Sequence, residues 1–243
     1  MPATPRQPPT VPDVVPLTRN TTDCVRVLSR LIAAGARFTE SPRGYYCYTP
    51  DVCVVLPRTY TSSSSQIIHF HGLRIGSWDS TAKGTVEHFK LLTLMYEDPK
   101  RLLVVPLGGK VYDLDQRYGS ADGFIALMER IHALTGESCS DLILSAHSAG
   151  YRPVTGILQS RATPVQMRRI CLYDALYSSG TINPLNRWLA DPKHSCYNIA
   201  PMSSSTYAAS TQVKHPRYKL ETDTHGQDHW GLVSQYWRQF TDG

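Results

Sequence analysis

Short apolar, β-branched runs alternate with longer amphipathic runs from residue 66 to residue 240, and this alternation constrains the fold more than any other feature of the sequence. Runs such as Leu142-Ile143-Leu144 place apolar side chains at consecutive positions, which is typical of strands buried on both faces. Alternating strands and helices indicate right-handed crossovers between parallel strands. The sequence therefore predicts an α/β protein, built as a three-layer α/β/α sandwich around a mostly parallel sheet. Strands are expected at 66–70, 101–106, 141–145, 169–173, 196–199 and 218–222, and helices at 85–96, 122–134, 149–159, 184–190, 204–212 and 230–240.

The part of the chain before residue 66 has a different character. Residues 1–22 are rich in proline and threonine, so we expect an extended or partly disordered arm there. Asp23 is a candidate cap for a helix that ends at Gly35. The apolar runs 45–48 and 52–56 predict a hairpin at an antiparallel edge of the sheet. Residues 23–243 are thus expected to form a single domain.

Composition excludes several classes of protein. The chain has 243 residues, enough to bury a core without disulfide or metal support. Its net charge of +5 is scattered along the sequence, so no nucleic-acid partner is expected. No apolar run approaches the length of a membrane span, and we expect a soluble protein with no membrane partner.

The cysteines and the N-terminus bear on the compartment. None of the cysteines has C-x-x-C spacing, and most lie in apolar runs, which indicates free, buried thiols. An even number also leaves up to three disulfides open for an exported protein. No signal peptide precedes the fold, which favours a cytoplasmic protein or an exported one whose leader was removed. The six cysteines of the chain are Cys24, Cys47, Cys53, Cys139, Cys171 and Cys196.

A candidate nucleophile follows the strand expected at 141–145. The sequence AHSAG, residues 146–150, places Ser148 between small residues at a strand-to-helix turn, as in a nucleophile elbow. In that geometry the backbone N–H of Ala149 faces the oxyanion that forms when the serine attacks a carbonyl. The alternative is a serine that caps a helix in an ordinary loop.

A nucleophilic serine needs a base and an acid later in the chain. Asp174 follows the next strand, and the strand after that, 196–199, is followed by no acidic residue, so Asp174 is the candidate acid. Two histidines follow the last strand. His229, at the start of the final helix, is the favoured base, with His225 as the alternative.

The segment after strand 66–70 supplies two further candidates. Gly72 would let the backbone approach the oxyanion, with the N–H of Leu73 as the second donor beside that of Ala149. His69 and His71 would also suit a metal pair on one strand, which leaves a metal-dependent hydrolase as an alternative. The sequence contains no dinucleotide or phosphate-binding motif, so no cofactor is expected.

These segments together resemble the α/β-hydrolase superfamily over residues 66–240. More narrowly, LSAHSAGYR at 144–152 and LYDALY at 172–177 resemble a group of largely uncharacterised bacterial α/β-hydrolases with an L-S-G-H-S-G-G-Y-R elbow. The resemblance implies Ser148 as nucleophile and Asp174 as acid, and it matches His229 better than His225. Ala146 and Ala149 stand where that group has glycines, and Pro153 lies early in the expected nucleophile helix.

The sequence thus predicts a serine hydrolase that acts through an acyl-enzyme. Residues 107–119 mix tyrosines with both signs of charge, which favours a polar binding rim over an oily lid. No insertion is long enough for a cap domain. We therefore expect a small or polar ester, or an amide, as a small-molecule substrate. The alternative from another class is a non-catalytic ligand-binding relative of the same fold.

Overall fold

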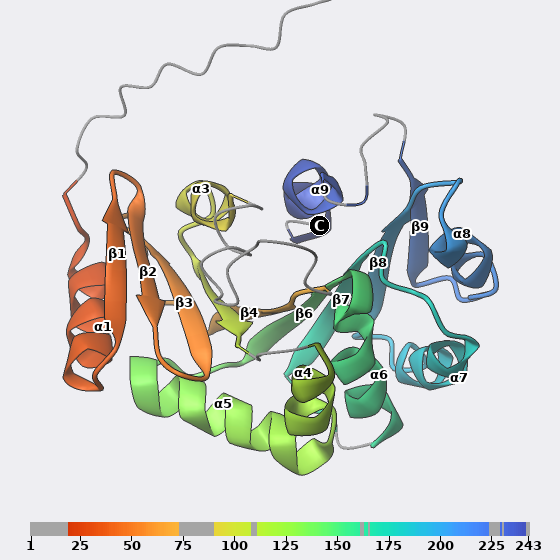
Figure 1. The fold of residues 1–243 in the computed structure, drawn as a ribbon, viewed down its shortest axis with the longest axis horizontal. Coiled ribbons are helices and arrows are strands. Elements are labelled where there is room, and N and C mark those ends of the chain that lie inside the picture. The colour runs from red at the N-terminus through yellow and green to blue at the C-terminus, as the bar shows by residue number, and fades with distance from the viewer. Residues whose placement is uncertain are drawn as a thin grey trace, which may run out of the picture.

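The computed structural model describes residues 19–72, 90–107, 111–160, 163–164, 166–223, 229 and 231–241. Within these ranges the core of the protein is a nine-stranded sheet in the order β1-β2-β3-β5-β4-β6-β7-β8-β9 (Figure 1). The strands are β1 (Arg37–Ser41), β2 (Gly44–Tyr48), β3 (Val52–Pro57), β4 (Ser65–Phe70), β5 (Arg101–Pro106), β6 (Asp141–His147), β7 (Met167–Tyr173), β8 (Ser195–Ala200) and β9 (Tyr218–Thr222).

The pairing of neighbouring strands changes from antiparallel to parallel at β5. Strands β1, β2, β3 and β5 pair antiparallel, whereas β5, β4, β6, β7, β8 and β9 all pair parallel. The parallel strands end at the same edge of the sheet, which is where ligands bind in folds of this kind. The predicted three-layer α/β/α class with a mostly parallel sheet is confirmed.

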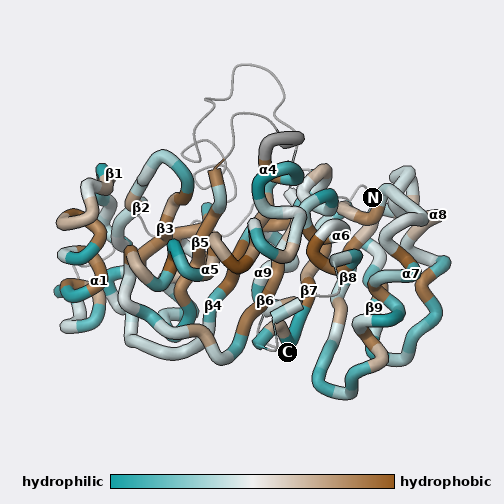
Figure 2. The backbone as a smooth tube through the Cα atoms, turned by 90° about the horizontal axis from the view of Figure 1, so that it is seen from below, coloured by the Kyte–Doolittle hydropathy of each residue, from teal (hydrophilic) through white to brown (hydrophobic). Residues whose placement is uncertain are grey.

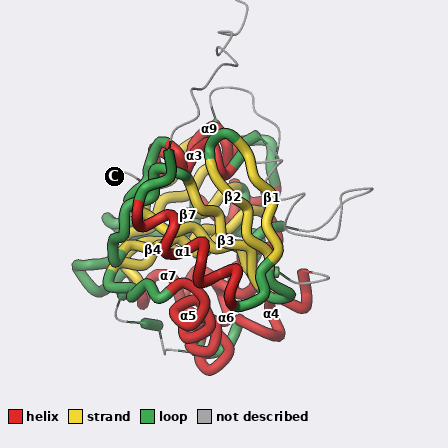
Figure 3. Tube along the Cα trace, turned by 90° about the vertical axis from the view of Figure 1, so that its left-hand side faces the viewer, coloured by secondary structure: helices red, strands yellow, loops and turns green. Residues whose placement is uncertain are grey.

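Helices cover both faces of the sheet (Figures 1 and 3). Helices α3 and α9 pack on one face, and their apolar residues form one core cluster with Ile67, Leu103 and Tyr173. Helices α1, α4, α5, α6 and α7 contribute to a second, larger cluster on the other face. The bounds are α1 (Thr22–Ala33), α3 (Leu91–Tyr96), α4 (Val111–Tyr118), α5 (Ala121–Thr135), α6 (Tyr151–Gln159), α7 (Ser179–Trp188), α8 (Ser205–Ser210) and α9 (Leu232–Thr241).

Hydropathy follows these layers. Hydrophobic stretches run along the central strands, while the outer helices alternate between hydrophobic and hydrophilic residues (Figure 2). In β6, every residue after Asp141 is buried, as the predicted burial on both faces requires. None of the described helices combines the length and apolar character needed to cross a membrane.

The structure differs from the sequence prediction in two elements that lacked an apolar pattern. Strand β1 was not expected, because its residues are largely exposed and the strand is held by backbone pairing with β2. Helix α4 covers most of segment 107–119, where a polar binding rim but no helix is expected from the sequence. It buries Leu114 and Tyr118, which lie one helical turn apart. Residues 108–110 of that segment lie outside the described residues.

Two helix starts also differ. Thr21, rather than Asp23, caps α1, because the Thr21 hydroxyl accepts the N–H of Cys24. Helix α7 begins at Ser179 instead of Pro184, since the Ser178 hydroxyl caps it and the proline is accommodated inside the helix. The predicted arm, apart from residues 19–22, lies outside the described residues.

All six cysteines are free, as predicted. Five of them are buried, and Cys139 is partly exposed.

Candidate active site

Ser148 stands at the sharp turn between β6 and the helical segment that follows it. Strand β6 ends at His147, a single 3₁₀ turn covers Ser148–Gly150, and α6 starts at Tyr151. The φ of Ser148 is 53°, in the left-handed region that non-glycine residues seldom occupy. A strained turn of this kind, with a serine at the end of a strand, is what a nucleophile elbow would require. Pro153 falls in the first turn of α6, where its missing N–H removes no helical hydrogen bond.

Two glycines make this turn possible. A Cβ on Gly150 would lie 2.2 Å from the carbonyl oxygen of Phe70, so this turn packs directly on the end of β4. A Cβ on Gly72 would lie 2.6 Å from the Ser148 Cβ and 3.1 Å from its Oγ. The backbone after β4 therefore lies against the Ser148 side chain, too close for a residue larger than glycine at position 72.

Asp174 lies at the carboxyl end of β7, the strand next to β6. It is 3% exposed and also has a positive φ, 47°. Burial opposes ionisation and is the largest influence on its pKa, but hydrogen bonds from His229, Thr206 and Ser204 together outweigh burial and hold the pKa below the usual range. Asp174 is thus a buried carboxylate that stays charged at neutral pH.

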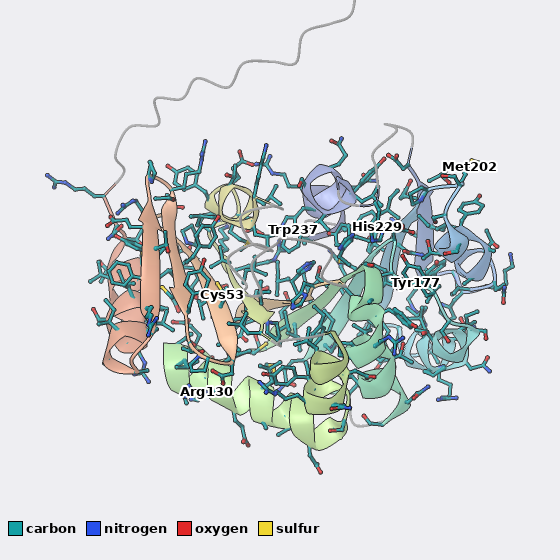
Figure 4. The ribbon with its side chains drawn as sticks, in the orientation of Figure 1. Cys53, Arg130, Tyr177, Met202, His229 and Trp237 are labelled. Atoms are coloured by element: carbon teal, nitrogen blue, oxygen red, sulfur yellow. The ribbon has the colours of Figure 1, made fainter. Side chains whose placement is uncertain are left out.

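His229 is the partner of that carboxylate. Its Nδ1 lies 2.6 Å from Oδ2 of Asp174, a bond between residues 55 positions apart. Because an ionised carboxylate only accepts, Nδ1 carries the proton of this hydrogen bond. In the neutral form of the ring, Nε2 is then the nitrogen without a proton. Figure 4 shows His229 between α9 and the strands β7 and β8. In the described part of the chain, Ser148 and His229 are not hydrogen-bonded to each other, and such bonds often tighten only when substrate binds.

The sequence reasoning missed two residues that contact this pair. The Thr206 hydroxyl, from the first turn of α8, donates to Oδ1 of Asp174. His147 is fully buried, and its Nε2 lies 2.8 Å from the backbone carbonyl oxygen of His229. A polar residue at a buried position of β6 is the sequence signal that could have pointed to His147. Thr206 has no such signal, because it lies in a separate element 32 residues after Asp174.

Tyr177 lies near Ser148. The residue is 42% exposed, and its ring lies 5.6 Å from the ring of Tyr151. Burial and the charge of Asp174 raise the pKa of this phenol, against the opposing effect of Ser148.

The histidines considered for a metal have other partners. His69 is fully buried; its Nδ1 lies 2.8 Å from the Ser145 hydroxyl, and its ring packs edge-on against Trp237. Burial, together with the nearby His147 and His71, lowers the pKa of His69 well below its usual value. Nδ1 of His71 lies 2.9 Å from the carbonyl oxygen of Gly72. No group of three or more His, Cys, Asp or Glu side chains arranged to hold a metal occurs among the described residues.

Two further candidates lie outside the described residues. They are Leu73, expected as an oxyanion donor, and His225, the alternative base. Ala149, the other expected donor, is described and buried directly after Ser148.

No protein-family model matches this sequence, and no curated protein does. Solved structures do match it over most of its length. LpqC, a poly(3-hydroxybutyrate) depolymerase from Bordetella parapertussis, superposes with a TM-score of 0.55 at 16% identity, covering 92% of this chain and 94% of that one. The chain has the α/β-hydrolase fold. A ferulic acid esterase (TM-score 0.53, 11% identity, 84% of this chain and 94% of that one) and an S-formylglutathione hydrolase from Agrobacterium tumefaciens (TM-score 0.52, 12% identity, 84% and 91%) are similar as well.

The α/β-hydrolase fold explains why these residues meet. Gly72, Ser148 and Asp174 follow the adjacent parallel strands β4, β6 and β7, so all three lie at one edge of the sheet. His229 reaches that edge from the connection between β9 and α9.

Proposed function

We propose that this protein is a serine hydrolase that transfers an acyl group to water through a covalent Ser148 intermediate. The observation that carries the proposal is the Asp174–His229 hydrogen bond at the sheet edge where Ser148 occupies a strained turn. A buried carboxylate bound to Nδ1 of a histidine is the arrangement that prepares a general base.

In the first half of the reaction, Nε2 of His229 takes the proton of the Ser148 hydroxyl as Oγ attacks the substrate carbonyl carbon. The carbonyl oxygen becomes an oxyanion, which the N–H groups of Ala149 and Leu73 stabilise. Asp174 stabilises the imidazolium that forms and holds its tautomer. The imidazolium then protonates the leaving group, and the acyl group remains on Ser148.

In the second half, His229 takes a proton from water, and the resulting hydroxide attacks the acyl carbon. The tetrahedral intermediate collapses, Oγ of Ser148 regains its proton from His229, and the carboxylic acid departs. No redox partner or cofactor is needed to balance these steps.

The substrate is a small or polar ester, or an amide. The partly exposed Tyr177, which lies near Ser148 and whose ring lies 5.6 Å from that of Tyr151, supports this class, because a phenol offers a polar hydroxyl as well as an aromatic ring.

Hydrolysis of a series of p-nitrophenyl esters of increasing acyl length tests this proposal. We expect turnover of the short esters, a loss on the order of 10⁵-fold in kcat for Ser148→Ala, and no effect of a chelator. Retained activity in Ser148→Ala would contradict the mechanism, and inhibition by the chelator would favour the metal alternative. A strong preference for long acyl chains would contradict the substrate class. Tight ligand binding without any turnover would favour the non-catalytic alternative.

A further inference from the structure

His147 precedes the nucleophile directly and makes two contacts with the proposed base. Its Nε2 lies 2.8 Å from the backbone carbonyl oxygen of His229, and the two ring centroids lie 4.4 Å apart at an interplanar angle of 38°. A carbonyl oxygen only accepts hydrogen bonds, so Nε2 of His147 must be the donor. The contact therefore fixes the tautomer of a fully buried imidazole.

The two hydrogen bonds to His229 restrain different parts of that residue. Asp174 binds the ring at Nδ1, at a distance of 2.6 Å, which fixes one end of the ring. His147 instead holds the main chain, in the connection between the end of β9 at Thr222 and the start of α9 at Leu232. With both bonds made, Nε2 of His229 has a defined direction.

The position of His147 links the base to the nucleophile. One peptide bond joins His147 to Ser148, and the turn at Ser148 packs against the chain that follows β4, at Phe70 through Gly150 and at Gly72 through Ser148 itself. The path from nucleophile to base thus consists of that peptide bond, one buried ring and one hydrogen bond. A buried histidine on a central strand normally has only a structural role, with its ring nitrogens hydrogen-bonded within the core. Here one hydrogen-bond partner of the His147 ring is the backbone carbonyl of His229, the proposed base.

We propose that His147 is a positioning residue that holds His229 at the distance and angle at which it accepts the Ser148 proton. The inference rests on the proposed function. Displacement of a reacting group by about 1 Å costs on the order of 100-fold in rate, so the loss of this tether is expected to lower kcat while substrate binding is retained.

Three variants at position 147 test the proposal. His147→Gln places an amide N–H close to the position of Nε2, His147→Leu fills similar space without a donor, and His147→Asn has a donor that is too short to reach. His194→Leu is the matched control, because His194 likewise stacks on an aromatic ring, that of Trp188, and its Nδ1 bonds a backbone carbonyl away from the site.

We expect kcat for p-nitrophenyl acetate to fall by about 10- to 100-fold in His147→Leu and His147→Asn, with KM changed less than about twofold, and to recover largely in His147→Gln. In proton NMR spectra, the downfield resonance of the His229 Nδ1–H should broaden or vanish in the Leu and Asn variants and persist in Gln. The His194→Leu control should leave both readouts unchanged.

The proposal is overturned if His147→Leu folds and keeps the wild-type kcat and the His229 Nδ1–H resonance. If His147→Leu does not fold, the proposal is overturned when His147→Asn has the same kcat and resonance as His147→Gln. The NMR readout needs no turnover. If the wild-type protein has no esterase activity, the proposed function is contradicted. The His229 Nδ1–H resonance in the His147 variants still decides whether His147 positions His229.

Discussion

At the scale of single residues, the site depends on two strained backbone positions. Ser148 and Asp174 have φ values of 53° and 47°, and among the described non-glycine residues only Lys90 shares the left-handed region. Such a conformation costs about 1–3 kcal/mol and persists only where the surroundings impose it. At Ser148 the surroundings are the backbones around Gly72 and Gly150. At Asp174 they include the bond from its own N–H to the carbonyl oxygen of Ile199, 2.8 Å long.

Asp174→Asn tests the charge at this position. The amide has nearly the shape of the carboxylate, but it cannot both accept from Nδ1 of His229 and supply a negative charge. We expect kcat to fall on the order of 10⁴-fold, because the histidine loses its tautomer and its imidazolium loses its counter-charge. Steady-state kinetics at pH 7–8 (about the range in which a neutral histidine acts as base) measure the effect. A loss of less than about tenfold would show that another carboxylate serves the base.

The lowered pKa of Asp174 predicts that the stability of the protein depends on pH, and Asp174→Asn tests this too. The pKa of Asp174 is lower in the folded protein than its usual value, so its charge adds stability above the unfolded pKa, near 3.9. That contribution is lost as the pH falls through the folded pKa. Denaturant unfolding at several pH values should show that the wild type loses stability relative to Asp174→Asn as the pH drops below about 4. A difference between the two proteins that does not change with pH would contradict the lowered pKa.

At the scale of elements, the sequence predicts the strands and helices that bury apolar side chains. Buried strands such as β6 and amphipathic helices such as α5 carry apolar patterns that predict them, and Ser148 and Asp174 follow from their place after such strands. Strand β1 is exposed and depends on a neighbour that no local pattern specifies. The Thr206–Asp174 bond is likewise a product of tertiary packing, because α8 brings its residue to the end of β7 only in the folded chain.

Helix α6, which follows the turn at Ser148, packs closely on the end of α4. A Cβ on Gly156 would lie 2.1 Å from the carbonyl oxygen of Gly119, a backbone atom that cannot move aside freely. Helix propensity alone would make Gly156→Ala stabilising by up to about 1 kcal/mol. We expect the opposite, a loss of about 1–3 kcal/mol from overpacking, measured by denaturant unfolding.

Gly180→Ala is the control for this prediction. At this helical position in α7 the nearest atom to a new Cβ is the side-chain Oγ of Ser178, 3.2 Å away, so a shift of a few tenths of an ångström within the cap makes room for it. A stabilising effect of Gly156→Ala would mean that α4 and α6 do not meet as described.

At the scale of the whole molecule, the site joins the two helical layers. Ser148 leads into α6, which packs into the larger core, whereas His229 precedes α9, which packs into the core on the opposite face. Ser148 and His229 are therefore brought to the same edge only when both faces of the sheet are covered. The His147–His229 bond spans this division at the sheet edge.

The two cores also determine how the thiols react. Burial raises the pKa of Cys47 and Cys171 to about 12, and that of the partly exposed Cys139 to about 12 as well. We expect a thiol reagent such as Ellman's to react slowly with the folded protein, Cys139 first, and rapidly with all six thiols after unfolding. The melting temperature should not change with added reductant. Fewer than six reactive thiols in the unfolded, unreduced protein would reveal a disulfide.

Labelling with a fluorophosphonate, followed by peptide mass spectrometry, tests the central claim most directly, because the reagent marks an activated serine whatever the substrate of the enzyme is. We expect one adduct, located on Ser148, absent in Ser148→Ala and formed much more slowly in Asp174→Asn. An adduct that forms on another residue, or one that is unchanged in Ser148→Ala, would contradict the assignment of Ser148 as the nucleophile.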